Sequence, residues 1–598
     1  MSLRGGLWAM FFFGLVINIH NHGGGLKIDF SPEGIFYVFT SLLAVLCFAI
    51  FLEVSLKGQV QRTVSTLAAF IFGIAFYFCK RTAFPFSYSL FHNNSAWIFH
   101  LDGIKLFYQI AHATFFASDF FWTLLFSILI WLSSKKRPPQ APTRQTKIIL
   151  MAVTTSVIFI VSFLQPYSYD PLTNFIRSVK THHFPSKNVV SSEAEFLAEL
   201  PRIEIASKFK AATKPHVFVV LVESLNSRFI NKTTSEGVIY TPFLNELTKK
   251  YLYFPNYFSN SIQTAKGHFA AICGQVPMLR SVEFKTKSCF ERQCLPSLMQ
   301  EAGYRTFFIQ ADPNFNTEGE RNFLRDHGIQ DFAEVVKPCE QEKDRCYGIG
   351  IRDDIFFNRA INYLTNNWDS KTPLFAVLAT VSSHMPFNSQ EEAEREIFKK
   401  PKNLKEHYLN MLRMTDTSLK VFFDSFFKSA LSKNAILIIT GDHGFPTGEH
   451  GSFHNENYAF TENFGVPLLM IDTRGDLKEK FSHLQNMAFS HLNLGPTIAD
   501  LAGLDVRTDF IAPSIFDDHS GQSHIPFVQP YSGGFQGVLR WPFHYIFEEH
   551  KEKEYLFNLE IDPEEKNPLN IADYHKQIRQ LRNEAGQIYV QQKIFQCQ

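Results

Sequence analysis

Hydrophobic and polar positions divide this chain of 598 residues into two parts of different character. Up to about residue 165 the sequence is rich in Phe, Leu and Ile, and it contains five apolar runs, at 7–19, 34–56, 65–79, 112–132 and 148–164. The second, fourth and fifth approach the roughly 20 apolar residues that a bilayer demands. The remainder has an ordinary globular pattern. We therefore predict an N-terminal α-helical transmembrane bundle of about five spans, followed by a soluble region.

The first run has a second interpretation, as a signal peptide, because Arg4 precedes a short apolar stretch. No A-x-A-like cleavage site follows it, however, and further hydrophobic segments do, which favours an uncleaved span.

Basic loops orient the predicted spans. The loop 133–147 carries five Lys or Arg residues and no acidic residue, and the short loop near Lys57 and Arg62 is also purely basic. The positive-inside rule places both loops in the cytoplasm. One further span then puts everything after about residue 164 outside the cytoplasm, on the far side of a membrane that the chain crosses several times.

The sequence after the last span suggests a tether and then one large domain. Residues 1–164 form the predicted membrane part, residues 165–213 a polar, Pro-containing tether, and residues 214–598 the large domain. Part of the tether, 196–200, is amphipathic and fits either a segment lying against lipid or a simple linker helix.

Strand-like and helical patterns alternate in the large domain. Apolar β-type runs occur at 216–222, 304–309, 374–381, 435–440 and 466–471, and helical patterns at 243–251, 355–364 and 408–427. This alternation is typical of a mostly parallel sheet with helices on both faces. The net charge of +1 argues against a general nucleic-acid binder, for which we would expect a basic balance.

Two of these strands end in groups that bind metal ions. The run 435–440 stops at Gly441-Asp442-His443-Gly444, and the run 216–222 stops at Glu223. The carboxyl ends of parallel strands meet at the edge where open α/β sheets place their chemistry. A carboxylate at the end of a buried strand is costly unless it is paired or bound to a metal. Both groups are therefore candidate ligands, although Asp442 is alternatively a capping residue of the following turn.

A third candidate, Thr264, stands where a Ser/Asn-rich loop enters an Ala-rich helical pattern. A hydroxyl near a helix N-terminus experiences the positive end of the dipole, and it loses its proton more readily if it also binds a metal. The alternative is a simple capping role. Lys266, two residues on, is a candidate for holding a phosphate oxygen.

With Glu223, Thr264 and Asp442-His443 in this order, the domain resembles the alkaline phosphatase and sulfatase superfamily. Within it, the chain is similar to the lipoteichoic acid synthase type of phosphoglycerol transferase, with the lipid A phosphoethanolamine transferases as relatives. The motifs that carry the resemblance are Leu221-Val-Glu-Ser-Leu-Asn, Thr241-Pro-Phe-Leu-Asn, Ser383-His384-Met-Pro-Phe387, Gly441-Asp-His-Gly, Gly465-Val-Pro-Leu, Asn493-Leu-Gly-Pro-Thr497 and Tyr555-Leu-Phe-Asn-Leu-Glu-Ile-Asp-Pro563. The implied fold of the domain is alkaline-phosphatase-like α/β.

The resemblance implies roles for particular residues. Glu223, Thr264, Asp442 and His443 would surround one divalent metal, with Thr264 as the nucleophile. His384 would be a second catalytic residue, which faces the substrate and either protonates the departing diacylglycerol or activates the acceptor. Arg321 and His454 are further implied substrate-facing residues, of which Arg321 is equally well an ordinary surface residue. His450 and His454 either approach the metal or lie in a solvated loop. Manganese is the first choice of metal for a carboxylate-rich site, with magnesium or zinc as alternatives.

The implied reaction moves a phosphoglycerol group from phosphatidylglycerol, through a phospho-threonine, to an extracytoplasmic glycan or lipid acceptor. Two alternatives stay open: transfer of phosphoethanolamine from phosphatidylethanolamine to lipid A or a glycan, and hydrolysis of a diester or sulfate ester. A sulfatase is disfavoured because Thr264-Ala-Lys-Gly-His lacks the Cys/Ser-x-Pro-x-Arg signature of those enzymes.

Four cysteines of the large domain stand in two close pairs, Cys289 with Cys294 and Cys339 with Cys346. An oxidising compartment allows a disulfide in each loop. Metal ligation is the competing interpretation, which no accompanying His cluster supports. Paired loop disulfides resemble the phosphoethanolamine transferases more than the lipoteichoic acid synthases.

Overall fold

The computed structural model describes most of the large domain and four helices of the N-terminal part. The described residues are 32–56, 58–82, 117–133, 143–164, 203–209, 213–279, 283–285, 293–313, 319–337, 339, 341, 346–347, 350–385, 387, 390–450, 459–517, 524–529, 535–548 and 553–595.

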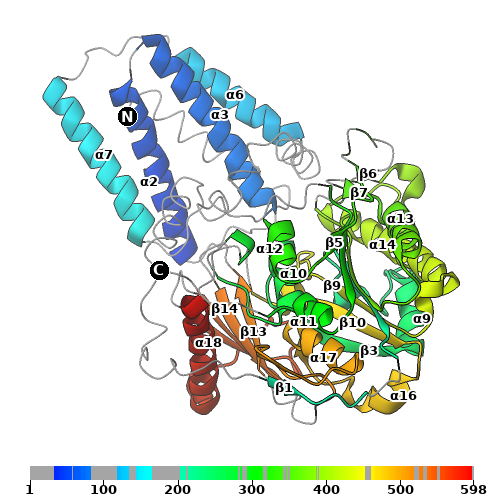
Figure 1. Cartoon of the computed structure of the whole chain (residues 1–598). Helices are drawn as coiled ribbons and strands as arrows, with labels where there is room; N and C mark the ends of the chain where they lie inside the picture. Colours follow the sequence, from blue (N-terminus) through cyan, green and yellow to red (C-terminus); the bar gives the residue numbers. More distant parts are fainter. Residues whose placement is uncertain are drawn as a thin grey trace.

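The four N-terminal helices coincide with four of the five predicted apolar runs. They are α2 (Pro32–Ser55), α3 (Gly58–Thr82), α6 (Ala117–Ser133) and α7 (Arg144–Leu164). Helix α2 packs against α7 and α3, and α3 packs against α6 (Figure 1). The run 7–19 lies outside the described residues. Of the helices that the structure describes, none is both long and apolar enough to span a membrane. The helices are confirmed, whereas the membrane crossing stays a prediction.

A mixed sheet forms the centre of the large domain (Figure 1). Within the described residues it has eight strands, in the order β11-β3-β10-β9-β2-β8-β4-β5. Their bounds are β2 (His216–Val222), β3 (Leu252–Phe258), β4 (Arg305–Gln310), β5 (Asp331–Phe332), β8 (Leu374–Ala379), β9 (Ala435–Gly441), β10 (Gly465–Asp472) and β11 (Phe489–Ser490). Only β10 among these runs antiparallel to its neighbours. All five predicted strands and the mostly parallel arrangement are confirmed.

Helices cover both faces of this sheet because its central strands are apolar on both sides. In β2, Val217 and Val219 pack into the core on one face, whereas Phe218 and Val220 pack into the core on the other. The first face is covered by α10 (Thr264–Cys273), α11 (Leu295–Glu301), α12 (Glu320–Asp326), α16 (Leu477–Phe481) and α17 (Leu494–Leu501). The second face is covered by α9 (Pro242–Lys250), α13 (Asp353–Asn367) and α14 (Leu404–Lys428). The three predicted helices are those of the second face.

A smaller antiparallel sheet, which the sequence pattern did not predict, follows in the chain. It consists of β13 (Ile525–Gln529), β14 (Phe535–Arg540), β15 (Phe543–Glu548) and β16 (Lys553–Asn558). Helix α18 (His575–Phe595) packs against one face. The other face packs against Phe258 of β3 and Phe464 of the short helix α15 (Thr461–Phe464). These contacts pack the smaller sheet against the large one.

The large domain begins upstream of residue 214. Strand β1 (Ile203–Ile205), in the predicted tether, pairs antiparallel with β12 (Val506–Thr508). Just after β1, the Lys208 backbone N–H donates to Asp500 Oδ1 at 2.8 Å. Residues 203–209 therefore belong to the folded domain rather than to the tether.

Candidate active site

Glu223 directly follows β2, and residues that follow β8 hold its backbone in place. Its backbone N–H donates to Thr380 Oγ1 at 3.1 Å, and its carbonyl accepts from Ser383 Oγ at 2.6 Å. The next residue, Ser224, has a φ of 51°, in the left-handed region. The side chain of Glu223 is 3% exposed. The end of β2 is thereby tied to the turn after β8, which carries His384.

Asp442 and His443 follow β9, directly beside the end of β2. Asp442 Oδ1 accepts from the backbone N–H groups of Ser224 and His443, at 2.8 and 2.7 Å. Asp442 Oδ2 is buried and has no hydrogen-bond partner. The Nδ1 atom of His443 lies 2.8 Å from the Gly444 carbonyl, which fixes the proton on Nδ1 and leaves Nε2 with a lone pair.

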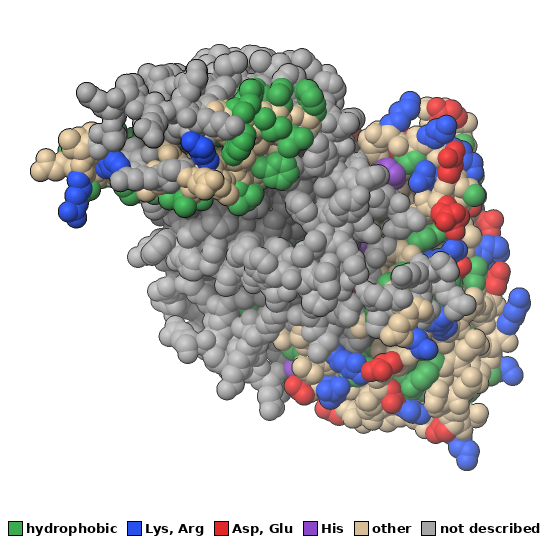
Figure 2. Space-filling model, turned by 90° about the horizontal axis from the view of Figure 1, so that it is seen from above, with side chains coloured by type: hydrophobic (Ala, Val, Ile, Leu, Met, Phe, Trp, Pro, Cys, Tyr) green, Lys and Arg blue, Asp and Glu red, His purple; other side chains and the backbone are tan. Residues whose placement is uncertain are grey.

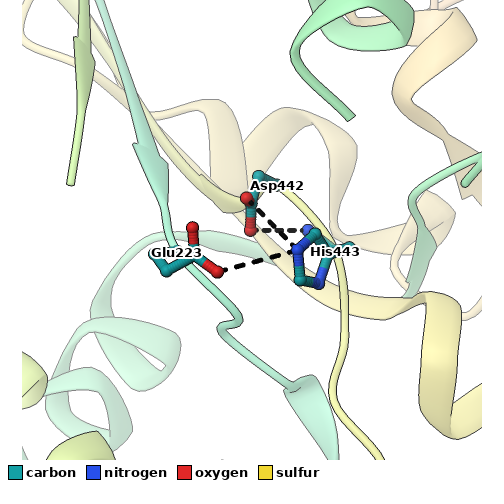
Figure 3. A group of neighbouring side chains, drawn as sticks. All are labelled: Glu223, Asp442 and His443. Atoms are coloured by element: carbon teal, nitrogen blue, oxygen red, sulfur yellow. Dashed lines mark hydrogen bonds and ion pairs between the residues drawn. The ribbon is translucent and has the colours of Figure 1, made fainter. Parts of the chain in front are cut away.

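These three side chains converge on one point (Figure 3). His443 Nε2 lies 3.6 Å from both Glu223 Oε1 and Asp442 Oδ2. One donor atom from each residue lies within 4.8 Å of the other two. Two buried carboxylate oxygens and an unprotonated imidazole nitrogen are ligands suited to a divalent cation. Asp442 Oδ2, which is buried without a hydrogen-bond partner, tests whether a metal fits, because a bound cation would give this oxygen a partner. The residues fit a divalent metal.

Burial and mutual repulsion influence the two carboxylates differently. Burial, followed by the charge of Glu223, raises the pKa of Asp442 to about 6. Burial also pushes the pKa of Glu223 upward, but the attraction of His384 and His443 in their protonated forms, together with hydrogen bonds from Ser224 and Thr264, holds that pKa below its ordinary value when no metal occupies the site. Both groups are therefore mainly ionised at neutral pH, and a cation between them would offset their repulsion.

Thr264 is the first residue of α10 and lies beside this group. Its Oγ1 donates to Glu223 Oε2 at 3.1 Å. The N-terminal end of α10 is the positive end of the helix dipole, which favours an anion next to the hydroxyl. A Cβ atom on Gly267 would lie 2.2 Å from the Asp442 carbonyl oxygen, so the helix packs directly on the end of β9.

His384 is half-buried at the turn after β8. Its Nδ1 lies 2.7 Å from the Met385 carbonyl, and its charge acts on Glu223. Phe387, with a φ of 63°, closes this turn and packs edge-on against Phe445 with 4.8 Å between ring centroids. The structure therefore brings together Glu223, Thr264, His384, Asp442 and His443, and the chemical roles of these residues stay predictions.

Other predicted site residues lie elsewhere. Lys266 is 1% exposed, and its Nζ lies 3.2 Å from Glu283 Oε1 and bonds the Met278 carbonyl. It is thus part of a buried ion pair, which corrects the predicted phosphate contact: the side chain anchors the segment that follows α10.

Arg321 and His450 are held by other partners. Arg321 donates to Glu334 at 2.9 Å and stacks over Phe332. His450 lies 2.6 Å from Glu462 and 3.1 Å from the Glu565 carbonyl, so both ring nitrogens are engaged away from the metal ligands. His454 lies outside the described residues.

Sequence reasoning missed two buried histidines next to the site. His268, one turn after Thr264, pairs with Glu320 at 2.8 Å. His491 Nε2 lies 2.9 Å from the Gly441 carbonyl, and burial lowers its pKa to about 3, so the neutral ring supports the strand end. The helical spacing of Thr264 and His268 was a usable signal, whereas nothing local points to Glu320.

One predicted disulfide pairing is wrong. Cys294 bonds to Cys273, the last residue of α10, and not to Cys289, which lies outside the described residues. Cys294 caps the N-terminus of α11, and the packing of α11 beside α10 selects this partner. The Cys339–Cys346 disulfide is confirmed.

With this geometry established, comparison with known proteins identifies the class. The family model described as Sulfatase matches residues 215–504. The chain therefore carries a domain of the sulfatase and alkaline phosphatase superfamily.

The chain is also similar to a curated relative within this superfamily. The lipoteichoic acid synthase of Staphylococcus aureus (strain USA300) is 25% identical over 374 residues, covering 58% of this chain and 55% of that protein. The match thus spans about half the length of that relative.

Two solved structures share the fold. A protein in the alkaline phosphatase superfamily from Vibrio parahaemolyticus has a TM-score of 0.53 at 18% identity, covering 66% of this chain and 92% of that one. The lipoteichoic acid synthase LtaP from Listeria monocytogenes has a TM-score of 0.52 at 16% identity, covering 70% and 97%. The alkaline-phosphatase-like fold is confirmed.

Proposed function

We propose that the chain is a metal-dependent transferase that moves phosphoglycerol from phosphatidylglycerol to an extracytoplasmic glycan or lipid acceptor. The observation that carries this proposal is the Thr264 hydroxyl, hydrogen-bonded to Glu223 within the group formed by Glu223, Asp442 and His443. Similarity to lipoteichoic acid synthases supports this choice of donor.

In the proposed first step, Thr264 Oγ attacks the phosphorus of the lipid phosphodiester. A bond from Oγ to phosphorus forms, and the bond from phosphorus to the diacylglycerol oxygen breaks. The Thr264 proton passes to Glu223 Oε2, to which it is already hydrogen-bonded. His384 gives a proton to the departing diacylglycerol oxygen. The product is diacylglycerol and a phosphoglycerol ester of Thr264.

In the second step, an acceptor alcohol attacks the same phosphorus. His384 takes the proton of that alcohol, and Thr264 recovers its own proton as the ester bond breaks. Glu223, Thr264, Asp442 and His443 would hold the divalent metal. When bound, such a metal lowers the pKa of a hydroxyl and neutralises charge developing on phosphate oxygens. Manganese is our first choice, with magnesium or zinc as alternatives.

We place this reaction at the outer face of a bacterial inner membrane. Apolar side chains of α3, α6 and α7 are exposed, whereas positive and negative side chains mix over the large domain (Figure 2). The basic sequence near Lys57 and Arg62 and at 133–147 supports a cytoplasmic location for the connections from α2 to α3 and from α6 to α7. The two disulfides support an oxidising compartment for the domain.

The second candidate is phosphoethanolamine transfer, which the same core residues would carry out. The Cys339–Cys346 disulfide favours it, since loop disulfides resemble that branch of the superfamily.

Intact mass spectrometry of the full-length protein distinguishes these functions. Wild type, Thr264→Val and Thr264→Ser would each be incubated with manganese and either phosphatidylglycerol or phosphatidylethanolamine, without acceptor. We expect wild type to gain one phosphoglycerol group, and Thr264→Val, which keeps the shape but lacks the hydroxyl, to gain none. Thr264→Ser should keep a measurable adduct. A phosphoethanolamine adduct would support the second candidate. Diester hydrolysis that persists in Thr264→Val would overturn the covalent mechanism.

A further inference from the structure

A second charged pair lies buried behind the proposed nucleophile. His268 Nδ1 lies 2.8 Å from Glu320 Oε1, and the two side chains are 1% and 4% exposed. His268 belongs to α10, and Glu320 is the first residue of α12, so the pair joins two helices of the same face. The ring of Phe308 packs edge-on against the imidazole, at 6.0 Å between centroids.

Helix geometry directs His268 toward the site. It follows Thr264 by four residues, so both side chains lie on one helical face, and helical side chains lean toward the N-terminus. Gly267, which directly precedes His268, packs on the Asp442 backbone. The carboxylates of Asp442 and Glu223 act electrostatically on His268.

The neighbouring carboxylates favour the protonated form of the imidazole. Burial alone would lower the pKa of His268, but the charge and hydrogen bond of Glu320, followed by the charges of Asp442 and Glu223, hold it above its ordinary value. His491, on the 3-10 turn His491–Asn493, is the neighbouring base, and the charge of His268 contributes to keeping it neutral.

Stability alone does not account for a buried ion pair here, because an apolar pair of similar size is often as stable. The hydrogen bond to Glu320 occupies Nδ1, and no hydrogen bond joins His268 Nε2 to any residue that the structure describes. The pair therefore holds the imidazole in a fixed orientation, where the charges of Asp442 and Glu223 add to that of Glu320 in favouring its protonated form.

We propose that His268, held by Glu320, is a positioning residue of the transfer reaction, whose positive charge offsets the negative charge that gathers when Thr264 attacks phosphorus. This inference rests on the proposed function. The attack brings a phosphodiester anion next to Glu223 and Asp442, and His268 is a cation that the chain itself supplies within one helical turn. Glu320 acts through His268 by fixing its charge and orientation.

The test measures the single-turnover rate of adduct formation on Thr264 in the full-length protein, with phosphatidylglycerol and manganese. The variants are His268→Gln, Glu320→Gln, Glu320→Asp and the double variant His268→Gln with Glu320→Gln. We expect both single Gln variants to lower the rate about 10- to 100-fold. The KM for lipid and the Kd for manganese should change less than about threefold. Glu320→Asp, which keeps the charge, should recover part of the rate. The double variant should match His268→Gln, because residues that act as one unit are not additive.

His544→Gln is the matched control, since it breaks another buried His–Glu pair, in which Nδ1 lies 2.5 Å from Glu565, in the smaller sheet. It should lower the melting temperature and leave the adduct rate per folded molecule unchanged. If His268→Gln behaves like His544→Gln, the pair at α10 is only structural and the inference is wrong. If wild type forms no adduct at all, the proposed function fails first. A wild-type adduct whose rate is insensitive to His268 and Glu320 contradicts the inference alone.

Discussion

Gly267 is the residue at which α10 meets the strand that carries Asp442. The position lies inside a helix, where Ala is normally favoured over Gly by about 1 kcal/mol. Here a Cβ would stand 2.2 Å from the Asp442 carbonyl oxygen, and a backbone atom cannot move aside as a flexible side chain can. Contact with the site therefore outweighs helix propensity.

We expect Gly267→Ala to destabilise the protein by about 3 kcal/mol, as overpacking does, and to reduce adduct formation on Thr264. Gly475→Ala is the matched control, because no atom lies within 4 Å of its added Cβ, and it should change stability by less than about 0.5 kcal/mol. Denaturant unfolding of both variants measures the difference. Equal stability of the two would show that α10 can shift away from β9 without cost.

Asp353 stabilises the turn that carries His384. Its Oδ1 accepts from the backbone N–H groups of Val381 and Ser382, at 3.2 and 3.1 Å, while Oδ2 is buried without a partner. Burial raises the pKa of Asp353 to about 6. The folded pKa therefore lies above the unfolded value of about 3.9.

This shift predicts a pH dependence of stability. The contribution of Asp353 is fully present below about pH 4 and is lost as pH rises through about 6, because the unfolded chain releases its proton first. The loss amounts to at most about 3 kcal/mol. Asp353→Asn removes this titration, so the variant should gain stability relative to wild type between pH 4 and 7.5. Urea unfolding at both pH values would reveal it, and a difference that stays constant with pH would contradict the assignment.

At the scale of elements, the two disulfides join segments in different ways. Cys273–Cys294 links the end of α10 to the start of α11 at a sequence separation of 21, whereas Cys339–Cys346 closes a loop at a sequence separation of 7. In the chain-entropy model a cross-link stabilises more when it closes a longer loop.

Replacing both cysteines of each pair by Ser should therefore have unequal effects. We expect a loss of about 3.4 kcal/mol for the Cys273–Cys294 pair and about 2.5 kcal/mol for the Cys339–Cys346 pair. Thermal unfolding under non-reducing conditions compares them. The reverse order would mean that native-state contacts, rather than loop length, determine the contribution of each bond.

The candidate metal site is a property of the whole molecule, since its candidate ligands follow strands more than 200 residues apart in sequence. Glu223 leaves β2, and Asp442 and His443 leave β9, so the ligands exist together only when the sheet is formed. A cation that binds only the folded state stabilises that state by mass action.

Adding manganese to the chelator-treated full-length protein should therefore raise its melting temperature. At 100 times the Kd the gain is about 2.7 kcal/mol. Asp442→Asn and Glu223→Gln, which keep the shape of the site, should lose this metal-dependent increase. An unchanged increase in both variants would place the bound cation somewhere else.

The sequence by itself determined where the buried strands end along the chain. It also determined which carboxylates and which imidazole follow those ends. Those signals are local, because an apolar β-branched run followed by Glu223 or by Asp442-His443 encodes both the strand and the group that it delivers. Five of the eight strands that the structure describes in the central sheet, and the convergence of Glu223, Asp442 and His443, could be predicted on this basis.

Tertiary structure alone decided which partner each remaining side chain found. Lys266 and His268 stand two residues apart on α10, yet one pairs with Glu283 and the other with Glu320, and Cys294 bonds to Cys273. These partners come from other elements of the fold, so no local pattern points to them. Helix packing, which brings distant segments to within hydrogen-bonding distance, supplied the information that the sequence pattern lacks.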